Sequence, residues 1–302
     1  MEFKEISEKC FYFSSPVNIG YVYQGGEGLL IDTGIDRGTS RKIVKLLKEK
    51  NYPINYAILT HAHTDHYGGA ASLKKDHQVK LYAPRLEAVI MENPILEPIY
   101  LWNGAMPIRK LRNKFLEAAP VTLDGVIEEG RQMIGPFNFE AVSLPGHSYG
   151  QSGILINGIL YAADSYFGKE VLAKHKVPFI VDVDAAIRSL KKLKTLSFEG
   201  AIPGHGEYEA DIEETVEANI NCHLNIREFL LHCIADSKEG IPMDELLKKL
   251  FKQYGLETSE VGQWLLYRTS FTAYISDLIE NNAISLAVRE SKLWLRNNPL
   301  NA

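Results

Sequence analysis

The segment Thr60-His61-Ala62-His63-Thr64-Asp65-His66-Tyr67-Gly68-Gly69 follows a short apolar run and decides how this chain is interpreted. His61 and His63 lie two residues apart, so in an extended stretch both rings project to the same side and one metal ion can bind both. Asp65 and His66 fall where the chain turns into a predicted helix, and they can face a second ion close by. Imidazole and carboxylate ligands suit zinc, and also iron or manganese. We therefore interpret this segment as a metal site.

Three further residues complete the pattern, and each follows a predicted strand. His147 and His205 both lie in Pro-Gly-His turns, and Asp164 follows the apolar strand predicted over residues 159–163. A lone histidine in such a turn is weak evidence for a metal, but these two supply ligands that the first segment lacks. The candidate metal ligands are His61, His63, Asp65, His66, His147, Asp164 and His205.

The pattern of strands and helices predicts an α/β fold. Short β-branched or aromatic runs, bounded by turn residues, alternate with amphipathic helical segments twice over, which indicates two similar halves. From about residue 211 the strands largely stop, and long amphipathic segments follow at residues 212–235, 243–254 and 261–280, before two short extended pieces. We expect a catalytic domain over residues 1–210 and a small helical, winged-helix-like domain over residues 211–302.

Residues 93–119 interrupt this alternation with prolines and aromatic residues, and we interpret them as a lid-like insert over the active site. The run Arg109-Lys110-Leu111-Arg112-Asn113-Lys114 inside it is best explained as the solvated face of a helix, with Ile108, Leu111, Phe115 and Leu116 facing inward. In the alternative, one or two of these cations contact an anionic substrate. The candidate substrate-binding residues are Tyr67, Tyr100, Trp102, Arg109, Tyr149 and Tyr166.

Charge and composition narrow the class of partner and the compartment. The 302 residues carry a net charge of −5, and no run approaches the roughly 20 apolar residues of a membrane span. Residues 1–8 have no apolar signal region, and the three cysteines form no Cys-x-x-Cys pair, so we expect a cytoplasmic protein. From residue 207 onward there are nine Lys and Arg against sixteen Asp and Glu. Nucleic-acid binding is therefore disfavoured, and a packing or homodimer role is left open for this region.

With these motifs in order, the chain resembles the metallo-β-lactamase superfamily over about residues 10–210. The resemblance rests on residues 60–69, on His147, Asp164 and His205, and on Asp32 within Leu30-Ile31-Asp32-Thr33-Gly34. It implies an αββα sandwich with the metals between the sheet edges. It also implies that His61, His63 and His147 bind a first zinc ion, that Asp65, His66 and His205 bind a second, that Asp164 bridges both, and that Asp32 supports the histidine loop without binding metal.

The function that the resemblance implies is metal-dependent hydrolysis. A hydroxide bridging two zinc ions would attack a small thioester, ester or lactone, and Asp65 would orient it or relay a proton. Glyoxalase II shares the pattern of residues 60–69, but residues 147–152 and Ala163, where glycine is usual, depart from it. The alternatives are a phosphodiesterase or ribonuclease of the same fold, an iron-dependent enzyme like the persulfide dioxygenases, and a metal-binding module without activity.

Overall fold

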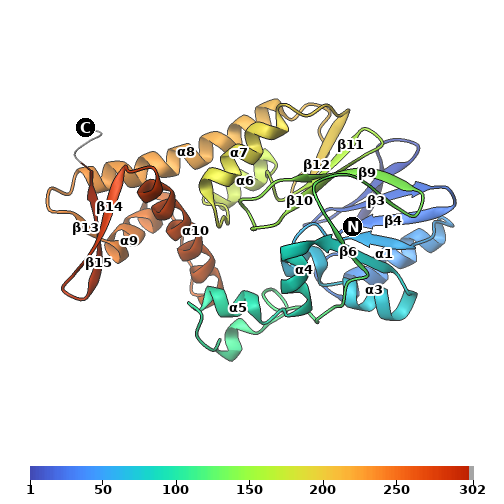
Figure 1. Cartoon of the computed structure of the whole chain (residues 1–302), viewed down its shortest axis with the longest axis horizontal. Helices are drawn as coiled ribbons and strands as arrows, with labels where there is room; N and C mark the ends of the chain where they lie inside the picture. Colours follow the sequence, from blue (N-terminus) through green and yellow to red (C-terminus); the bar gives the residue numbers. More distant parts are fainter. Residues whose placement is uncertain (299–302) are drawn as a thin grey trace.

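In the computed structural model, which describes residues 1–298, two sheets stack face to face and helices cover their outer faces (Figure 1). The first sheet has seven strands in the order in which they occur along the chain: β1 (Glu2–Glu5), β2 (Cys10–Ser14), β3 (Ile19–Gln24), β4 (Glu27–Ile31), β5 (Tyr56–Ile58), β6 (Lys80–Pro84) and β7 (Gly125–Ile127). The second sheet has the order β12-β11-β10-β9-β8, with β8 (Gly130–Ile134), β9 (Phe137–Ser143), β10 (Ser152–Ile156), β11 (Ile159–Ala163) and β12 (Gly200–Pro203).

Alternation along the strands creates two kinds of core. In β4, Leu29 and Ile31 belong to the cluster between the sheets, whereas Leu30 belongs to the cluster beneath the helices. The helices that cover the first sheet are α1 (Arg37–Glu49), α3 (Ala70–His77) and α4 (Arg85–Glu92), and α7 (Val183–Leu193) covers the second. The predicted αββα sandwich is confirmed.

The strand order brings the sequence motifs to one end of the sandwich. Strands β4, β5 and β6 are parallel neighbours, as are β11 and β12. Asp32 follows β4 directly, the histidine segment follows β5, Asp164 follows β11, and His205 follows β12. Because parallel strands end at the same edge of a sheet, these turns lie together, as in other open α/β sheets that bind ligands there.

The helical region predicted at the end of the chain is present. It consists of α8 (Glu213–Ala235), α9 (Met243–Tyr254) and α10 (Val261–Glu280), with a three-stranded sheet of order β13-β15-β14 formed by β13 (Ile241–Pro242), β14 (Ile284–Arg289) and β15 (Lys292–Asn297). The winged-helix interpretation stays a prediction. Helix α8 runs from the sandwich to this region (Figure 1), because Val216 and Ile220 pack with the second sheet and Leu230 and Ile234 pack with α9 and α10.

The insert at residues 93–119 contains α5 (Leu96–Leu101) and a single 3₁₀ turn, η1 (Arg109–Leu111). The helix predicted for the basic run is therefore wrong. Asn113 ends the turn, since its side chain donates to Lys110 O and accepts from Phe115 N. Leu111 and Leu116 face inward as expected and pack against Leu265 of α10, but Ile108 and Phe115 are exposed.

Among residues 1–298, no helix combines the length and the apolar character needed to cross a membrane.

Candidate metal centre

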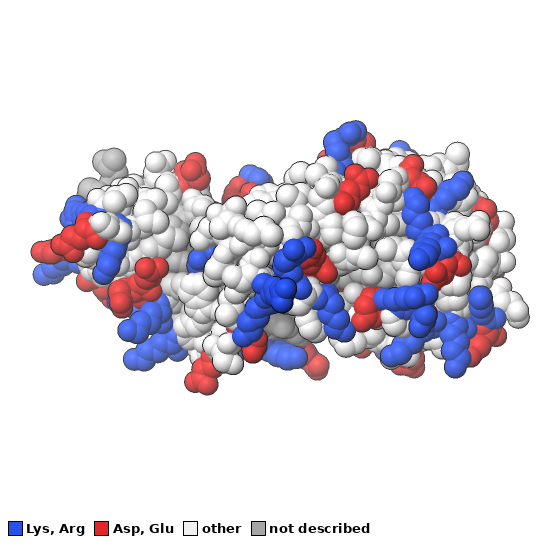
Figure 2. Space-filling model, turned by 90° about the horizontal axis from the view of Figure 1, so that it is seen from below, with Lys and Arg blue, Asp and Glu red and all other residues white. Residues whose placement is uncertain are grey.

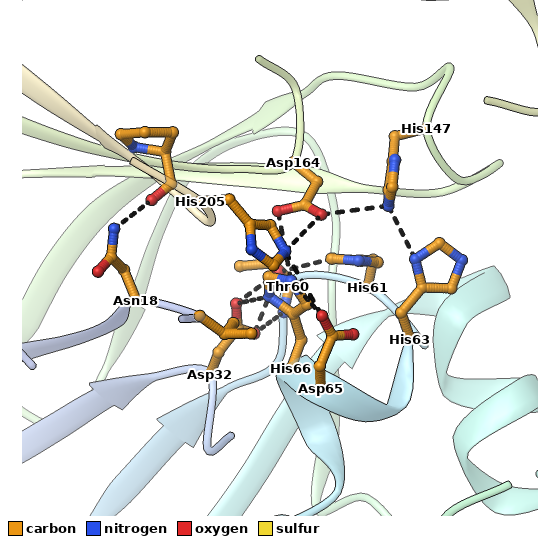
Figure 3. Close-up of polar contacts among 12 residues, drawn as sticks. Asn18, Asp32, Thr60, His61, His63, Asp65, His66, His147, Asp164 and His205 are labelled. Carbon is orange, nitrogen blue, oxygen red and sulfur yellow. Dashed lines mark hydrogen bonds and ion pairs between the residues drawn. The ribbon is translucent and has the colours of Figure 1, made fainter. Parts of the chain in front are cut away.

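All seven candidate ligands meet at the ends of the strands (Figure 3). Asp164 lies at the centre: its Oδ2 atom is 3.3 Å from both His147 Nε2 and His205 Nε2, and its Oδ1 atom is 3.3 Å from His66 Nε2. Three sets have ligand atoms that all lie within 4.8 Å of one another, namely His61, His63 and His147; Asp65, His66 and His205; and His61, His66 and Asp164. The first two sets coincide with the two that the family resemblance implies.

Asp32 orients two of the histidines without entering the cluster. Its Oδ2 atom accepts from His66 Nδ1 at 2.8 Å, and its carboxylate also accepts from the backbone and hydroxyl of Thr60. Because the Thr60 hydroxyl donates to Asp32, it accepts from His61 Nδ1 at 3.1 Å. Both imidazoles therefore carry their hydrogen on Nδ1 and turn the Nε2 lone pair toward the cluster.

Backbone carbonyls orient two more histidines in the same way. His147 Nδ1 donates to Phe179 O at 3.0 Å, and His205 Nδ1 donates to Pro16 O at 2.7 Å. A carbonyl can only accept, so the Nε2 atom of each neutral ring is left as a lone pair that faces the cluster. Four histidines from three turns thus point their Nε2 atoms into the cluster, and His147 Nε2 lies 2.8 Å from His63 Nδ1, within hydrogen-bonding distance (Figure 3).

The donor set fits a metal. His61 Nε2, His66 Nε2 and Asp164 Oδ1 are fully buried and have no hydrogen-bond partner within residues 1–298. Buried polar atoms almost always have partners, and a cation would satisfy all three atoms. Burial, followed by the charges of neighbouring histidines, lowers the pKa of His61 well below its ordinary value and lowers the pKa of His63 to about 3. These rings are neutral near pH 7, which is the form that binds metal.

The acidic side of the cluster behaves differently. Burial by itself lowers the pKa of His205, but the carboxylates of Asp164 and Asp65 outweigh it and raise that pKa to about 10. For His66, burial is likewise outweighed by Asp164 and Asp32, and its pKa lies well above the ordinary value. Without a metal ion, the rings of His66 and His205 are protonated and positively charged. A metal ion that binds here would replace these protons and provide the positive charge next to the carboxylates.

Glycines keep the cluster open. A Cβ atom on Gly204 would lie 1.9 Å from Asp164 Oδ1 and 2.8 Å from His66 Cε1, so no side chain fits there. Gly146, which precedes His147, has a φ of 132° and would clash with the backbone of Ala186. Ala163 has a φ of 50°, which is a glycine-favouring conformation, and this explains why glycine is usual before the aspartate.

Glu87 is a residue of this site that the sequence reasoning missed. It lies on α4 and is 1% exposed, and its carboxylate accepts from Ala62 N at 2.7 Å, from Gly150 N at 2.7 Å and from Ser148 Oγ at 2.9 Å. It therefore joins the loop of His61 and His63 to the loop of His147. The available signal was a charged residue among the apolar positions of a predicted helix, since Ala88 and Met91 share its buried face.

A cavity of about 620 Å³ opens onto the cluster. His63, Asp65, His147, Asp164 and His205 form its base, and Glu97, Lys174 and His175 add polar groups. The rest of its wall is mostly apolar and comes from the β2–β3 loop, the β4–α1 loop, the insert, residues 167–179 and α10: Val17, Ile35, Phe115, Leu116, Phe167, Val171, Leu172, Pro178, Phe179 and Leu266.

None of the six predicted substrate-binding residues lines this cavity within the described part of the chain. Tyr67 and Tyr166 are each 1% exposed, because they pack in the cores between helices and sheets. Trp102 packs against the Leu101–Leu265 cluster, and Tyr100 and Tyr149 are exposed elsewhere. Arg109 lies exposed on η1. The aromatic residues that do line the cavity are phenylalanines.

Two curated relatives of the chain are named as a thioesterase and a hydrolase. It is 26% identical to the atrochrysone carboxyl ACP thioesterase of Aspergillus fumigatus, over 65% of this chain and 53% of that one. It is 27% identical to the hydroxyacylglutathione hydrolase of Vibrio cholerae, over 58% of this chain and 57% of the relative. The chain thus spans little more than half the length of these relatives.

A solved structure is similar over nearly the whole chain. The metallo-beta-lactamase family protein of Thermus thermophilus superposes with a TM-score of 0.75 at 18% identity, and the match covers 97% of this chain and 100% of that one. The likeness therefore includes the helical region after the sandwich. The family model described as the metallo-beta-lactamase superfamily matches residues 14–205, and the chain belongs to that superfamily.

Proposed function

We propose that this protein is a dizinc hydrolase that cleaves a small thioester, ester or lactone whose acyl part is largely apolar. The observation that carries the proposal is the cavity: about 620 Å³ of mainly apolar space ends directly on the histidine and aspartate cluster. Pockets of this volume and lining suit small organic ligands. A thioester is the first choice, because one relative described above is named a thioesterase and the other a hydroxyacylglutathione hydrolase.

His61, His63 and His147 would hold one zinc ion, Asp65, His66 and His205 the other, and Asp164 would contact both. When bound, the ions would lower the pKa of a coordinated water to about 7 and polarise the scissile carbonyl. Both aspartates border the cavity, but the Asp164 side chain is only 4% exposed, whereas the Asp65 side chain is 32% exposed. Asp65 is therefore the carboxylate placed to meet substrate and water.

Hydrolysis adds the oxygen of water to the acyl carbon, breaks the bond to sulfur or oxygen, and leaves a proton to be moved to the departing group. Asp65 can accept that proton and return it, since its Oδ2 atom is within 3.4 Å of His205 Nε2 and its carboxylate borders the cavity. Phe167 and Phe179 exclude water from the same wall. Both phenylalanine rings also pack against His147, with centroid distances of 5.8 and 5.6 Å.

The nucleic-acid alternative is not favoured. On the face shown in Figure 2, Lys and Arg side chains are interspersed with Asp and Glu and form no continuous basic stripe. Three cations of the insert are paired with carboxylates: Lys110 with Glu260, Arg112 with Glu117, and Lys114 with Asp36. A nucleic-acid-binding site needs Lys and Arg side chains that are free to contact the phosphate backbone of the nucleic acid.

The test combines metal analysis with a substrate panel. Protein purified without added metal should contain two zinc ions per chain, and one iron ion would instead favour the dioxygenase alternative. The panel consists of acyl thioesters, p-nitrophenyl esters, lactones and bis-p-nitrophenyl phosphate. Turnover of the carbonyl substrates with little activity on the phosphodiester is the expected result, and the reverse order would overturn the proposal.

A further inference from the structure

Glu97 differs from the other buried carboxylates near the site. It lies on α5 of the insert, is 4% exposed, and forms part of the wall of the cavity. Across residues 1–298, its carboxyl takes part in no hydrogen bond or ion pair. By contrast, Glu87 accepts three hydrogen bonds, and Asp32 accepts from Thr60 and His66. A buried carboxyl without a partner is rare and expensive.

The surroundings of Glu97 offer it no cation. Burial raises the pKa of Glu97 well above its ordinary value, and the nearby negative charges of Asp65 and Glu87 raise it further. The charge of Glu97 in turn contributes to raising the pKa of Tyr100 and of Tyr67, but neither hydroxyl group forms a hydrogen bond with Glu97. Lys174 lines the same cavity and is exposed, yet no ion pair joins it to Glu97. Above the aspartates of its base, the cavity therefore has one further carboxyl group, which has no protein partner among residues 1–298, in an otherwise mainly apolar wall.

This arrangement has a consequence for the ligand. Water can solvate Glu97 while the cavity is open, but a purely apolar acyl group would displace that water and leave the carboxyl unpaired. An unpaired buried polar group weakens binding by roughly 10- to 100-fold. Sites built to bond a hydroxyl group discriminate strongly against analogues that lack it, for the same reason. The group that occupies the cavity must therefore bring a polar partner of its own.

We propose that Glu97 is a specificity-determining residue that hydrogen-bonds a hydroxyl group on the acyl part of the substrate. The proposal rests on the hydrolase function proposed above and narrows it from apolar acyl groups to hydroxylated ones. A hydroxyl can donate to a carboxylate and can also accept from a carboxylic acid, so it pairs with Glu97 in either protonation state. The remaining methylenes of such a group contact Phe115, Leu116 and Phe179.

The experiment compares the hexanoyl thioester of one thiol with the thioesters of the same thiol whose hexanoyl group carries a hydroxyl at carbon 3, 4, 5 or 6. Only the presence and position of the acyl hydroxyl then differ between substrates. We expect kcat/KM of the wild-type protein to be at least tenfold higher for one hydroxylated position than for the plain chain. Glu97→Leu should abolish this preference, and Glu97→Gln, which keeps two hydrogen-bonding atoms, should retain part of it. Glu92→Gln, on the exposed end of α4, should match the wild type.

The proposal would be overturned by the absence of a hydroxyl preference in the wild type, or by a preference that Glu97→Leu and Glu97→Gln both leave unchanged. An aminohexanoyl thioester preferred over every hydroxylated one, and lost in Glu97→Gln, would also overturn it, in favour of a cationic ligand. A binding assay with hydroxyhexanoic acids against hexanoic acid separates this inference from the hydrolase proposal. If hydroxyhexanoic acids bind more tightly than hexanoic acid only when Glu97 is present, but no thioester is hydrolysed, the hydroxyl-binding role of Glu97 would stand and the proposed hydrolase activity would be refuted.

Discussion

The base of the cavity and its wall are built in different ways. The base consists of histidines and aspartates in turns at the ends of β5, β9, β11 and β12. Each imidazole except that of His63 is held by a hydrogen bond from its Nδ1 atom to a group outside the metal cluster. Most of the wall comes from the insert, residues 167–179 and α10, which lie far apart along the chain and meet mainly through apolar packing. We therefore expect the base to provide the chemistry and the wall to provide the selectivity.

The two regions are also secured differently. At the base, buried polar hydrogen bonds converge on the ligands, and Asp32 and Glu87 accept most of them. In the wall, Leu101, Leu111 and Leu116 pack against Leu265, and Arg268 donates to Leu101 O at 3.1 Å. Apolar packing tolerates exchange of one side chain for another of similar size, whereas a buried polar network does not. We expect mutations to affect the base more than the wall.

The largest effect is expected at the ligands themselves. His147→Ala and Asp65→Ala should each lower kcat/KM by roughly a thousandfold and reduce the metal content, because ligand loss should exceed the 10- to 100-fold that outer partners cost. Turnover and bound metal per chain are the measurements. His77→Ala, at the exposed end of α3, is the control and should behave as wild type. Full activity and full metal content in both ligand variants would contradict the assignment of the base.

Glu87 should give the next largest effect, although it touches neither metal nor substrate. Glu87→Ala leaves the amides of Ala62 and Gly150 and the hydroxyl of Ser148 without their acceptor. We expect a loss of about 3 kcal/mol in unfolding free energy and a 10- to 100-fold loss in metal affinity. Denaturant unfolding and chelator competition measure the two quantities separately.

A purely structural role for Glu87 would lower stability and leave metal affinity unchanged. Glu87→Gln distinguishes the two roles, since its amide oxygen still accepts but the geometry of three donors on one carboxylate is lost. Partial recovery of metal affinity by the glutamine is expected. Equal metal affinity in wild type, alanine and glutamine variants would show that the two ligand loops hold their positions without this residue.

The contrast between base and wall explains what the sequence could predict. The candidate ligands could be proposed because a metal needs particular residue types, and four of the seven lie within residues 61–66. Glu87 and Glu97 were not found, because their roles depend on which segments the fold brings beside α4 and α5. The positions of aromatic residues could not be predicted for the same reason: Tyr67 packs inside a core, while Phe115 was expected inside and is 64% exposed.

The base can also be tested by pH. In metal-depleted protein, His66 and His205 have a pKa above the ordinary value, about 10 for His205, so both hold protons at pH 7 that a metal ion must displace. Zinc affinity should therefore rise with pH, by about tenfold per pH unit for each proton released. Competition with a chromophoric chelator between pH 6 and 8 measures the slope. A flat profile would mean that these two histidines do not exchange protons for metal.

The smallest effect is expected where α10 reaches the wall. Leu266 lines the cavity beside Phe115 and Leu116, so the region after the sandwich contributes directly to the substrate space. Leu266→Ala removes apolar contact worth about 1 kcal/mol to a bound acyl chain, and KM for a hexanoyl thioester should rise about fivefold while kcat changes little. An acetyl thioester, too short to fill the cavity, should show no change. Leu286→Ala, on exposed β14, is the matched control. An equal rise in KM for both thioesters would indicate that Leu266 acts by holding the insert in place. Substrate binding by the wall would then depend on the packing between its segments, as metal binding by the base depends on its hydrogen bonds.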